Sequence, residues 1–175
     1  RILFLSKTFG DAMELDPETK IIRNRTAHYA HGGYTRALYL SNGDILLSGP
    51  QRFEPLKPGE ARVQCWLYVL DRSGTKPAVP LGTKCSEGPA VSRKRLHIAW
   101  THIAAQYSDE MPPGSSRMQE ADLEYRDGQP TLVNQRLIVD SRDLPFRYTL
   151  ETQNYRPPDE RELTFSAYGH QGTDV

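Results

Sequence analysis

The chain has 175 residues and carries 22 Lys and Arg residues against 22 Asp and Glu residues, so its formal net charge is zero. This balance argues against nucleic acid as a partner, because proteins attract nucleic acid and anionic membranes through a broad basic field. No apolar run approaches the roughly 20 residues that a helix needs to cross a bilayer, so we expect no membrane span.

The first part of the chain alternates between short strand-forming runs and turns. Asp16-Pro17-Glu18-Thr19 has good turn chemistry, since Asp bonds its own backbone and Pro presets φ. Asn42-Gly43 is a strong hairpin signal, because both residue types tolerate positive φ. Around these turns we predict strands at residues 2–6, 21–25, 34–40 and 45–47.

The rest of the chain repeats this arrangement with longer connections. Turns are predicted at residues 71–74 (Asp-Arg-Ser-Gly) and 126–128 (Arg-Asp-Gly). Breaker residues make 51–60 a loop. The stretch 103–119 contains Pro112-Pro113-Gly114-Ser115-Ser116, a run that is not expected to form regular structure, so this stretch is predicted to be a surface loop of functional interest. Strands are predicted at residues 63–70, 78–81, 89–91, 96–100, 121–125, 132–139 and 147–153.

One pattern, a polar turn followed by a short apolar strand, occurs four times. Its clearest copy is residues 92–100 (Ser-Arg-Lys-Arg-Leu-His-Ile-Ala-Trp), and a second copy is residues 157–165. Residues 40–48 form a looser copy, and residues 1–4 match the end of another. Recurrence at a period of tens of residues indicates an architecture built from repeats.

The strand pattern and the repeats together predict the fold class. Few windows show helical periodicity, and the 13 Gly and 13 Pro residues argue against long helices. Short strands with frequent turns are typical of a sandwich or a propeller, and repetition favours a β-propeller of four-stranded antiparallel blades. We therefore expect an all-β protein with approximate repeats at residues 1–48, 49–100 and 101–165, and with residues 166–175 leading into a further blade.

Three stretches resemble the repeat of TolB-like β-propellers, a WD40-like family: residues 92–100, the turn at Pro158-Asp159, and residues 66–74. In that family the turn is typically Ser-Pro-Asp-Gly, followed by a basic residue and an apolar strand. Here Arg93-Lys94-Arg95 replaces Pro-Asp-Gly in one copy, and Glu160 replaces Gly in another. The resemblance covers about three blades. It implies a fold that serves in binding scaffolds, peptidase gating domains and polysaccharide lyases.

The phase of the repeat predicts an incomplete propeller. When the strands of each blade are counted outward from the central channel, the chain begins with the second strand of one blade and ends after the second strand of another. About three blades do not close a ring that usually has four to eight. The partner expected first is therefore the remaining blades, from the same parent protein or another chain. The resemblance implies a periplasmic or extracellular location. Cys65 and Cys85 are expected to be free buried thiols, with a single disulfide as the alternative.

The same count of strands places four of the five histidines on one rim of the propeller: His28, His31, His102 and His170. Converging imidazoles could bind a divalent or transition metal ion, or act as a general base. No HExxH or CxxC spacing strengthens that hypothesis. Solvated loop histidines are therefore the favoured interpretation, and no cofactor is evident.

A second set of rim candidates contains a carboxylate, a guanidinium and phenols. Glu87 precedes a predicted innermost strand, Tyr34 and Arg36 occupy the comparable stretch of the preceding blade, and Tyr168 lies on the same rim. Facing one cavity, such groups could hold a sugar acid or a peptide terminus, because Arg binds carboxylates bidentately. The favoured interpretation is instead that Glu87 and Arg36 tie neighbouring blades together, where a wedge-shaped interior leaves polar groups near water.

The functional prediction is a binding scaffold that presents its loop-rich rim to a protein or a carbohydrate. The sequence contains no Gly-x-Ser-x-Gly elbow and no phosphate-cradling loop. Two alternatives stay open. One is a metal-assisted polysaccharide lyase, or another hydrolytic or redox propeller enzyme, with the rim histidines near the metal. The other is the gating propeller of a peptidase. Trp66 and Trp100 are expected to pack between blades.

Overall fold

The computed structural model describes residues 1–27, 33–50, 65–83, 86–103, 115–144 and 148–169. This part of the chain is all-β, as predicted, and its helical content is one 3-10 turn, η1 (Ser141–Asp143). No helix in these ranges is long and apolar enough to cross a membrane.

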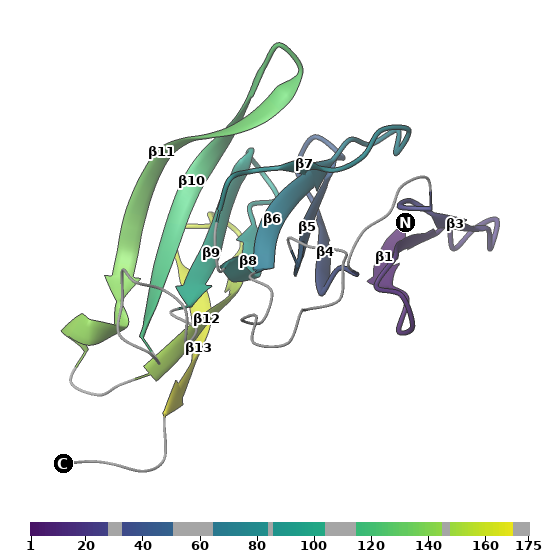
Figure 1. Ribbon diagram of the computed structural model, residues 1–175. Coiled ribbons are helices and arrows are strands. Elements are labelled where there is room, and N and C mark those ends of the chain that lie inside the picture. The colour runs from purple at the N-terminus through teal and green to yellow at the C-terminus, as the bar shows by residue number, and fades with distance from the viewer. Residues whose placement is uncertain (28–32, 51–64, 84–85, 104–114, 145–147, 170–175) are drawn as a thin grey trace, which may run out of the picture.

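The strands form four antiparallel sheets that follow one another along the chain (Figure 1). The first sheet contains β1 (Ile2–Leu5), β2 (Ala12–Leu15) and β3 (Ile22–Asn24). The second contains β4 (Arg36–Tyr39), β5 (Ile45–Pro50), β6 (Cys65–Leu70) and β7 (Val79–Pro80). The third contains β8 (Ser86–Val91), β9 (His97–Ile103), β10 (Ser116–Arg126) and β11 (Gln129–Asp140). The fourth contains β12 (Tyr148–Tyr155) and β13 (Leu163–Gly169).

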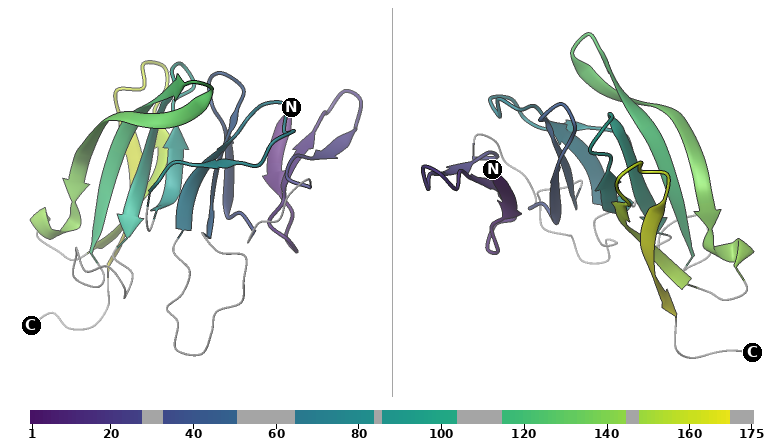
Figure 2. Two further views of the ribbon diagram at one scale, coloured as in Figure 1. Left: turned by 45° about the horizontal axis from the view of Figure 1, so that its top comes forward. Right: turned by 180° about the vertical axis from the view of Figure 1, so that it is seen from behind.

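Each sheet packs against the next one in chain order. β1 contacts β4, β4 contacts β8, and β8 contacts β12, so the first strands of the second, third and fourth sheets are neighbours. Figure 2 shows the first sheet at one side of the molecule and the third and fourth sheets at the other. Four-stranded antiparallel sheets are thus confirmed for the second and third sheets, and no sheet in the described ranges closes on itself.

The second sheet is buried on both faces, which explains its apolar sequence. On β5, Ile45 and Leu47 belong to a core cluster shared with the first sheet, whereas Leu46 belongs to a cluster shared with the third sheet. Successive side chains of a strand point to opposite faces, so an unbroken apolar run indicates a strand with neighbours on both sides. Trp100 of β9 lies in the second of these clusters and is 2% exposed, which confirms its place in the core.

The predicted turns are present, although one differs in type. Asp16 and Asp71 each accept hydrogen bonds from backbone N–H groups two and three residues ahead. At the β4–β5 hairpin only Gly43 has positive φ (90°), so Asn42 does not take the left-handed conformation expected of it. The Gly43 N–H donates to the Leu40 carbonyl at 3.0 Å, which makes this a tight turn followed by a glycine bulge.

The stretch 103–119 is more regular at its ends than the sequence predicts. β9 extends to Ile103, and β10 begins at Ser116, where the two residues are paired. The prediction that Ser116 is irregular is wrong, because its pairing with Ile103 satisfies the backbone and makes it the first residue of β10. Residues 104–114, like the predicted loop at 51–60, lie outside the described residues.

Candidate functional site

Arg36 and Glu87, which were predicted to face one cavity, lie near the starts of neighbouring strands. Arg36 is the first residue of β4 and Glu87 is the second residue of β8, and the two strands contact each other. The Arg36 side chain is half-buried, whereas the Glu87 side chain lies outside the described structure. The fold therefore brings the two backbone positions to adjacent strands, and the meeting of their side chains stays a prediction.

The two candidate tyrosines have different surroundings. Tyr34 is 7% exposed, and its ring meets that of Tyr68 edge-on at a centroid distance of 5.7 Å. A Cβ at Gly49 would lie 2.9 Å from a Tyr34 ring carbon, so the ring is tightly enclosed. Tyr34 is therefore part of the core between the first and second sheets. Tyr168 lies on β13 opposite Thr149 of β12, and its side chain lies outside the described part.

Of the four rim histidines, the structure describes one. His102 lies near the end of β9, paired with Ser86 on one side and Arg117 on the other. It lines a groove of about 450 Å³ that also includes Gln119 and Gln135. His28, His31 and His170 lie outside the described residues. Among the residues that are described, no group of three or more His, Cys, Asp or Glu side chains is arranged to hold a metal ion. The side chains of Cys65 and Cys85 also lie outside this part.

The most developed polar cluster surrounds Glu120 of β10, between the third and fourth sheets. The Glu120 carboxylate accepts a hydrogen bond from the Tyr155 hydroxyl at 3.2 Å and forms an ion pair with Arg136. Its Oε2 atom also lies 3.1 Å from His97 Nε2, while His97 Nδ1 lies 2.7 Å from Asp122 Oδ1. Both ring nitrogens of His97 therefore lie within hydrogen-bond distance of a carboxylate oxygen.

The electrostatics of this cluster keep its carboxylates ionised and its phenol neutral. Burial alone would raise the pKa of Glu120, but hydrogen bonds from His97 and Arg136 outweigh it and lower that pKa below its ordinary value. Hydrogen bonds from Asn134 and His97 likewise lower the pKa of Asp122. Burial and the neighbouring Glu120 carboxylate raise the pKa of Tyr155, so its hydroxyl remains a donor at neutral pH.

A matching contact joins the first and second sheets. The Tyr39 hydroxyl donates to Glu14 of β2 at 2.7 Å, and Glu14 also accepts from Arg25 at 3.5 Å and from Arg1 at 3.2 Å. Tyr39 and Tyr155 occupy the same place, the last residue of a first strand before its hairpin turn. We call the Glu14–Tyr39 and Glu120–Tyr155 hydrogen bonds the inter-sheet clamps.

The interface between the second and third sheets has apolar residues at the equivalent positions. Val69 of β6 and Glu120 of β10 hold equivalent places in their sheets. Val69 is paired with Leu46 and Glu120 with Ala99, and each of these partners lies two residues after a hairpin turn. Val91 ends β8 as Tyr39 ends β4, and it packs against the cluster that contains Val69. The same position therefore joins neighbouring sheets through a Tyr–Glu pair at two interfaces and through valines at the third.

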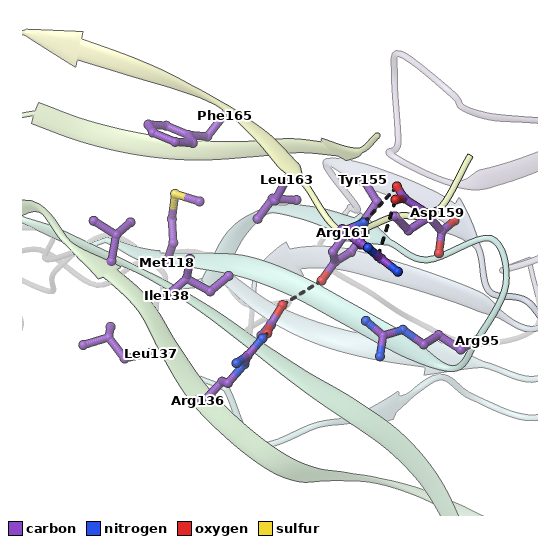
Figure 3. Close-up of a pocket in the computed structure, with 13 residues that line it drawn as sticks. Arg95, Met118, Arg136, Leu137, Ile138, Tyr155, Asp159, Arg161, Leu163 and Phe165 are labelled. Carbon is purple, nitrogen blue, oxygen red and sulfur yellow. Dashed lines mark hydrogen bonds and ion pairs between the residues drawn. The ribbon is translucent and has the colours of Figure 1, made fainter. Parts of the chain in front are cut away.

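The described structure also contains a larger groove, between β10 and β11 on one side and β13 on the other, and Glu120, Arg136 and Tyr155 are part of its lining (Figure 3). Its volume is about 710 Å³. Met118 and Ile138 lie on one side of it and Leu163 and Phe165 on the other, whereas the Leu137 side chain lies on the opposite side of the β11 ribbon from Ile138. Arg95 and Arg161 lie toward the turn end, where the Arg161 guanidinium is 3.5 Å from Asp159.

Sequence reasoning missed both the clamps and the groove. The clamp residues lie on different sheets and share no spacing that marks a known site. A usable signal is the tyrosine directly before the turn in two repeats, Tyr39 and Tyr155, together with a glutamate inside an otherwise β-forming segment.

No protein-family model, no curated protein and no solved structure matches the chain.

Proposed function

We propose that the chain is a segment of a TolB-like β-propeller from a secreted or periplasmic protein, and that it serves as a binding scaffold for a protein or a carbohydrate. The observation that carries this proposal is the order of the sheets, which are consecutive antiparallel meanders whose first strands β4, β8 and β12 are neighbours in turn. Propellers are built in this way, from four-stranded blades arranged around a central channel.

The clamps support the phase of the repeat. Glu14 lies two residues before the turn that begins at Asp16, as Val69 lies two residues before the turn that begins at Asp71, so β2 corresponds to the third strand β6. The first sheet then supplies second to fourth strands, and the fourth sheet supplies a first and a second strand. The repeats 1–48, 49–100 and 101–165 stay a prediction, and their boundaries fall inside β5, β9 and β13.

A scaffold is favoured over an enzyme because the described polar clusters have structural roles. The Glu14 and Glu120 carboxylates are occupied by contacts between sheets. The rim positions Arg36 and Glu87, on the adjacent strands β4 and β8, are then the place to look for a bound carboxylate.

Binding of acidic probes tests this proposal. The purified chain should bind saturably to uronic acid oligosaccharides or to peptides with a free C-terminal carboxylate, displayed on one array. Arg36→Ala should weaken that binding by roughly tenfold or more, as the loss of a central arginine contact usually does. Arg126→Ala is the matched control, because Arg126 lies at the β10–β11 turn with its side chain 66% exposed.

Absence of binding to both probe classes, or equal binding by the Arg36→Ala chain, would overturn the rim proposal. Metal analysis separates it from the enzymatic alternative. Stoichiometric Mn, Cu, Zn or Ca that disappears when His28 and His31 are replaced would favour the metal-dependent lyase instead.

A further inference from the structure

The groove that His102 lines lies between the second and third sheets, on the face of the third sheet that packs against the second. Its volume is about 450 Å³, which is in the range of small-molecule sites. One wall is formed by residues 80–83, and the other comes from β9, β10 and β11. The described lining contains no Asp, Glu, Lys or Arg, but it contains two amide side chains, Gln119 and Gln135. We call it the glutamine groove.

The wall at residues 80–83 is fixed to β6. The Leu81 N–H donates to the Leu67 carbonyl at 2.9 Å, and the Leu67 N–H donates to Thr83 Oγ1 at 3.0 Å. Between these contacts Gly82 has positive φ (73°), and nothing beyond its chain neighbours lies within 4 Å of an added Cβ. The Gly82 backbone therefore faces open space while the residues on both sides of it are held. A wall built in this way does not have to be ordered when a ligand binds.

A β-bulge in β11 directs Gln135 into the groove. At this bulge Asn134 and Gln135 together face one residue of β10, and Asn134 takes positive φ (53°). The Asn134 amide donates to Asp122 at 2.9 Å, on the face toward the fourth sheet. Arg136 pairs with Glu120 on that same face. An inserted residue changes the alternation of side chains along a strand, so Gln135 lies on the opposite face from both of its neighbours.

The two glutamines form a pair of amides inside the groove. Gln135 Nε2 donates to Gln119 Oε1, so the two amides lie side by side. An amide has two donor hydrogens and an acceptor oxygen with two lone pairs, so this bond leaves each side chain able both to donate and to accept. His102 adds an imidazole, and Leu81 and Leu132 add partly buried apolar surface. The described lining thus combines polar groups with apolar surface and has no carboxylate, ammonium or guanidinium group.

We propose that the glutamine groove binds a neutral oligosaccharide. A sugar hydroxyl has one donor hydrogen and two acceptor lone pairs, which matches the paired amides, and the C–H groups of the ring would cover Leu81 and Leu132. An ionised ligand would lose its hydration here without gaining a partner of opposite charge from the described lining. Arg36 does not line this groove, so the proposal is independent of the rim site.

An array of neutral oligosaccharides tests this proposal. It displays di- and trisaccharides of glucose, galactose, mannose, xylose and N-acetylglucosamine at high density, because multivalent display strengthens weak binding. The whole chain should bind at least one of these sugars saturably, and the same sugar in solution should compete. Gln119→Leu and Gln135→Leu should each weaken binding roughly three- to tenfold, the scale of one or two lost hydrogen bonds.

Gln129→Leu is the matched control. Gln129 is an exposed glutamine on the same strand, β11, and it does not line the groove, so this variant should bind as the unchanged chain does. Gln135 is exposed, so Gln135→Leu supplies the test even where Gln119→Leu does not fold. Arg36→Ala should leave the binding of neutral sugars unchanged.

Three results would contradict the proposal. One is that no neutral sugar binds, and another is that the folded glutamine variants bind as well as the unchanged chain. The third is that peptides without charged side chains bind on the same array while the sugars do not, since the groove then takes a protein partner. Binding of neutral sugars without binding of acidic probes would keep this proposal and reject the rim scaffold, and the converse result would do the opposite.

Discussion

Replacement of Tyr39 by Phe tests the inter-sheet clamps directly. The substitution keeps the ring, which packs at the core between the first and second sheets, and removes the hydroxyl that donates to Glu14 at 2.7 Å. Glu14 is 4% exposed, so water replaces the lost donor poorly. A hydrogen bond to a charged group contributes about 1.5–3 kcal/mol, and Glu14 retains Arg25, so we expect a loss of about 2 kcal/mol in the free energy of unfolding.

Tyr155→Phe provides the comparison within the same molecule. Its hydroxyl lies 3.2 Å from Glu120, longer than the usual distance for such a bond, and Glu120 keeps His97 and Arg136 as partners. We therefore expect a smaller loss, about 1 kcal/mol. Urea unfolding at pH 7, followed by tryptophan fluorescence, measures both values. A loss under about 0.5 kcal/mol for Tyr39→Phe, or a larger loss for Tyr155→Phe, would refute the clamp interpretation.

Further predictions concern pH, the core and a turn. Burial and the Glu14 carboxylate raise the pKa of Tyr39 to about 12. The contribution of the Tyr39 hydroxyl to stability is therefore complete below its unfolded pKa of about 10 and is lost as pH rises toward 12. Tyr39→Phe should flatten the alkaline limb of a stability–pH curve. The lowered pKa of Glu120 acts in the opposite direction, since its contribution is present above the unfolded value of about 4.3 and is lost as pH falls; Glu120→Gln should flatten the acid limb. Leu46→Ala, at a fully buried site, should cost about 3–5 kcal/mol in urea unfolding, whereas Leu137→Ala, at a half-exposed site, should cost under about 1 kcal/mol; similar values would contradict the assigned core. Gly43→Ala should cost about 1–2 kcal/mol through its positive φ alone, because nothing lies within 4 Å of the added Cβ, and an unchanged melting temperature would exclude the assigned turn.

The sequence predicts the strands well because their signals are local. The Asp16 and Asp71 turns follow from side chains that bond their own backbone, and the β-rich runs between turns pair with their nearest neighbours. The start of β10 at Ser116 is not predictable in the same way. Breakers just before it suggest a loop, and the strand is set by its pairing with Ile103, which no local signal reveals.

The site was less predictable because its parts come from separate sheets. Glu120 and Tyr155 are 35 residues apart, and neither residue belongs to a motif that would indicate their hydrogen bond. Tyr34 was predicted as a rim residue because it occupies the stretch of its blade that is comparable to that of Glu87, and its part in binding stays a prediction. Its burial depends on Gly49 and Tyr68, which approach it through tertiary packing.

Each strand of the described ranges is paired with a strand next to it in sequence, and this has a consequence for how the protein is made. Each sheet can complete its hydrogen bonds from residues that leave the ribosome together, without waiting for a distant part of the chain. The second sheet has an apolar face on each side. The face that packs on the first sheet is covered early, whereas the face that packs on the third sheet stays exposed until β9 and β10 emerge. We therefore expect nascent chains that end before Trp100 to require a chaperone, and chains that extend past Arg126 to release it.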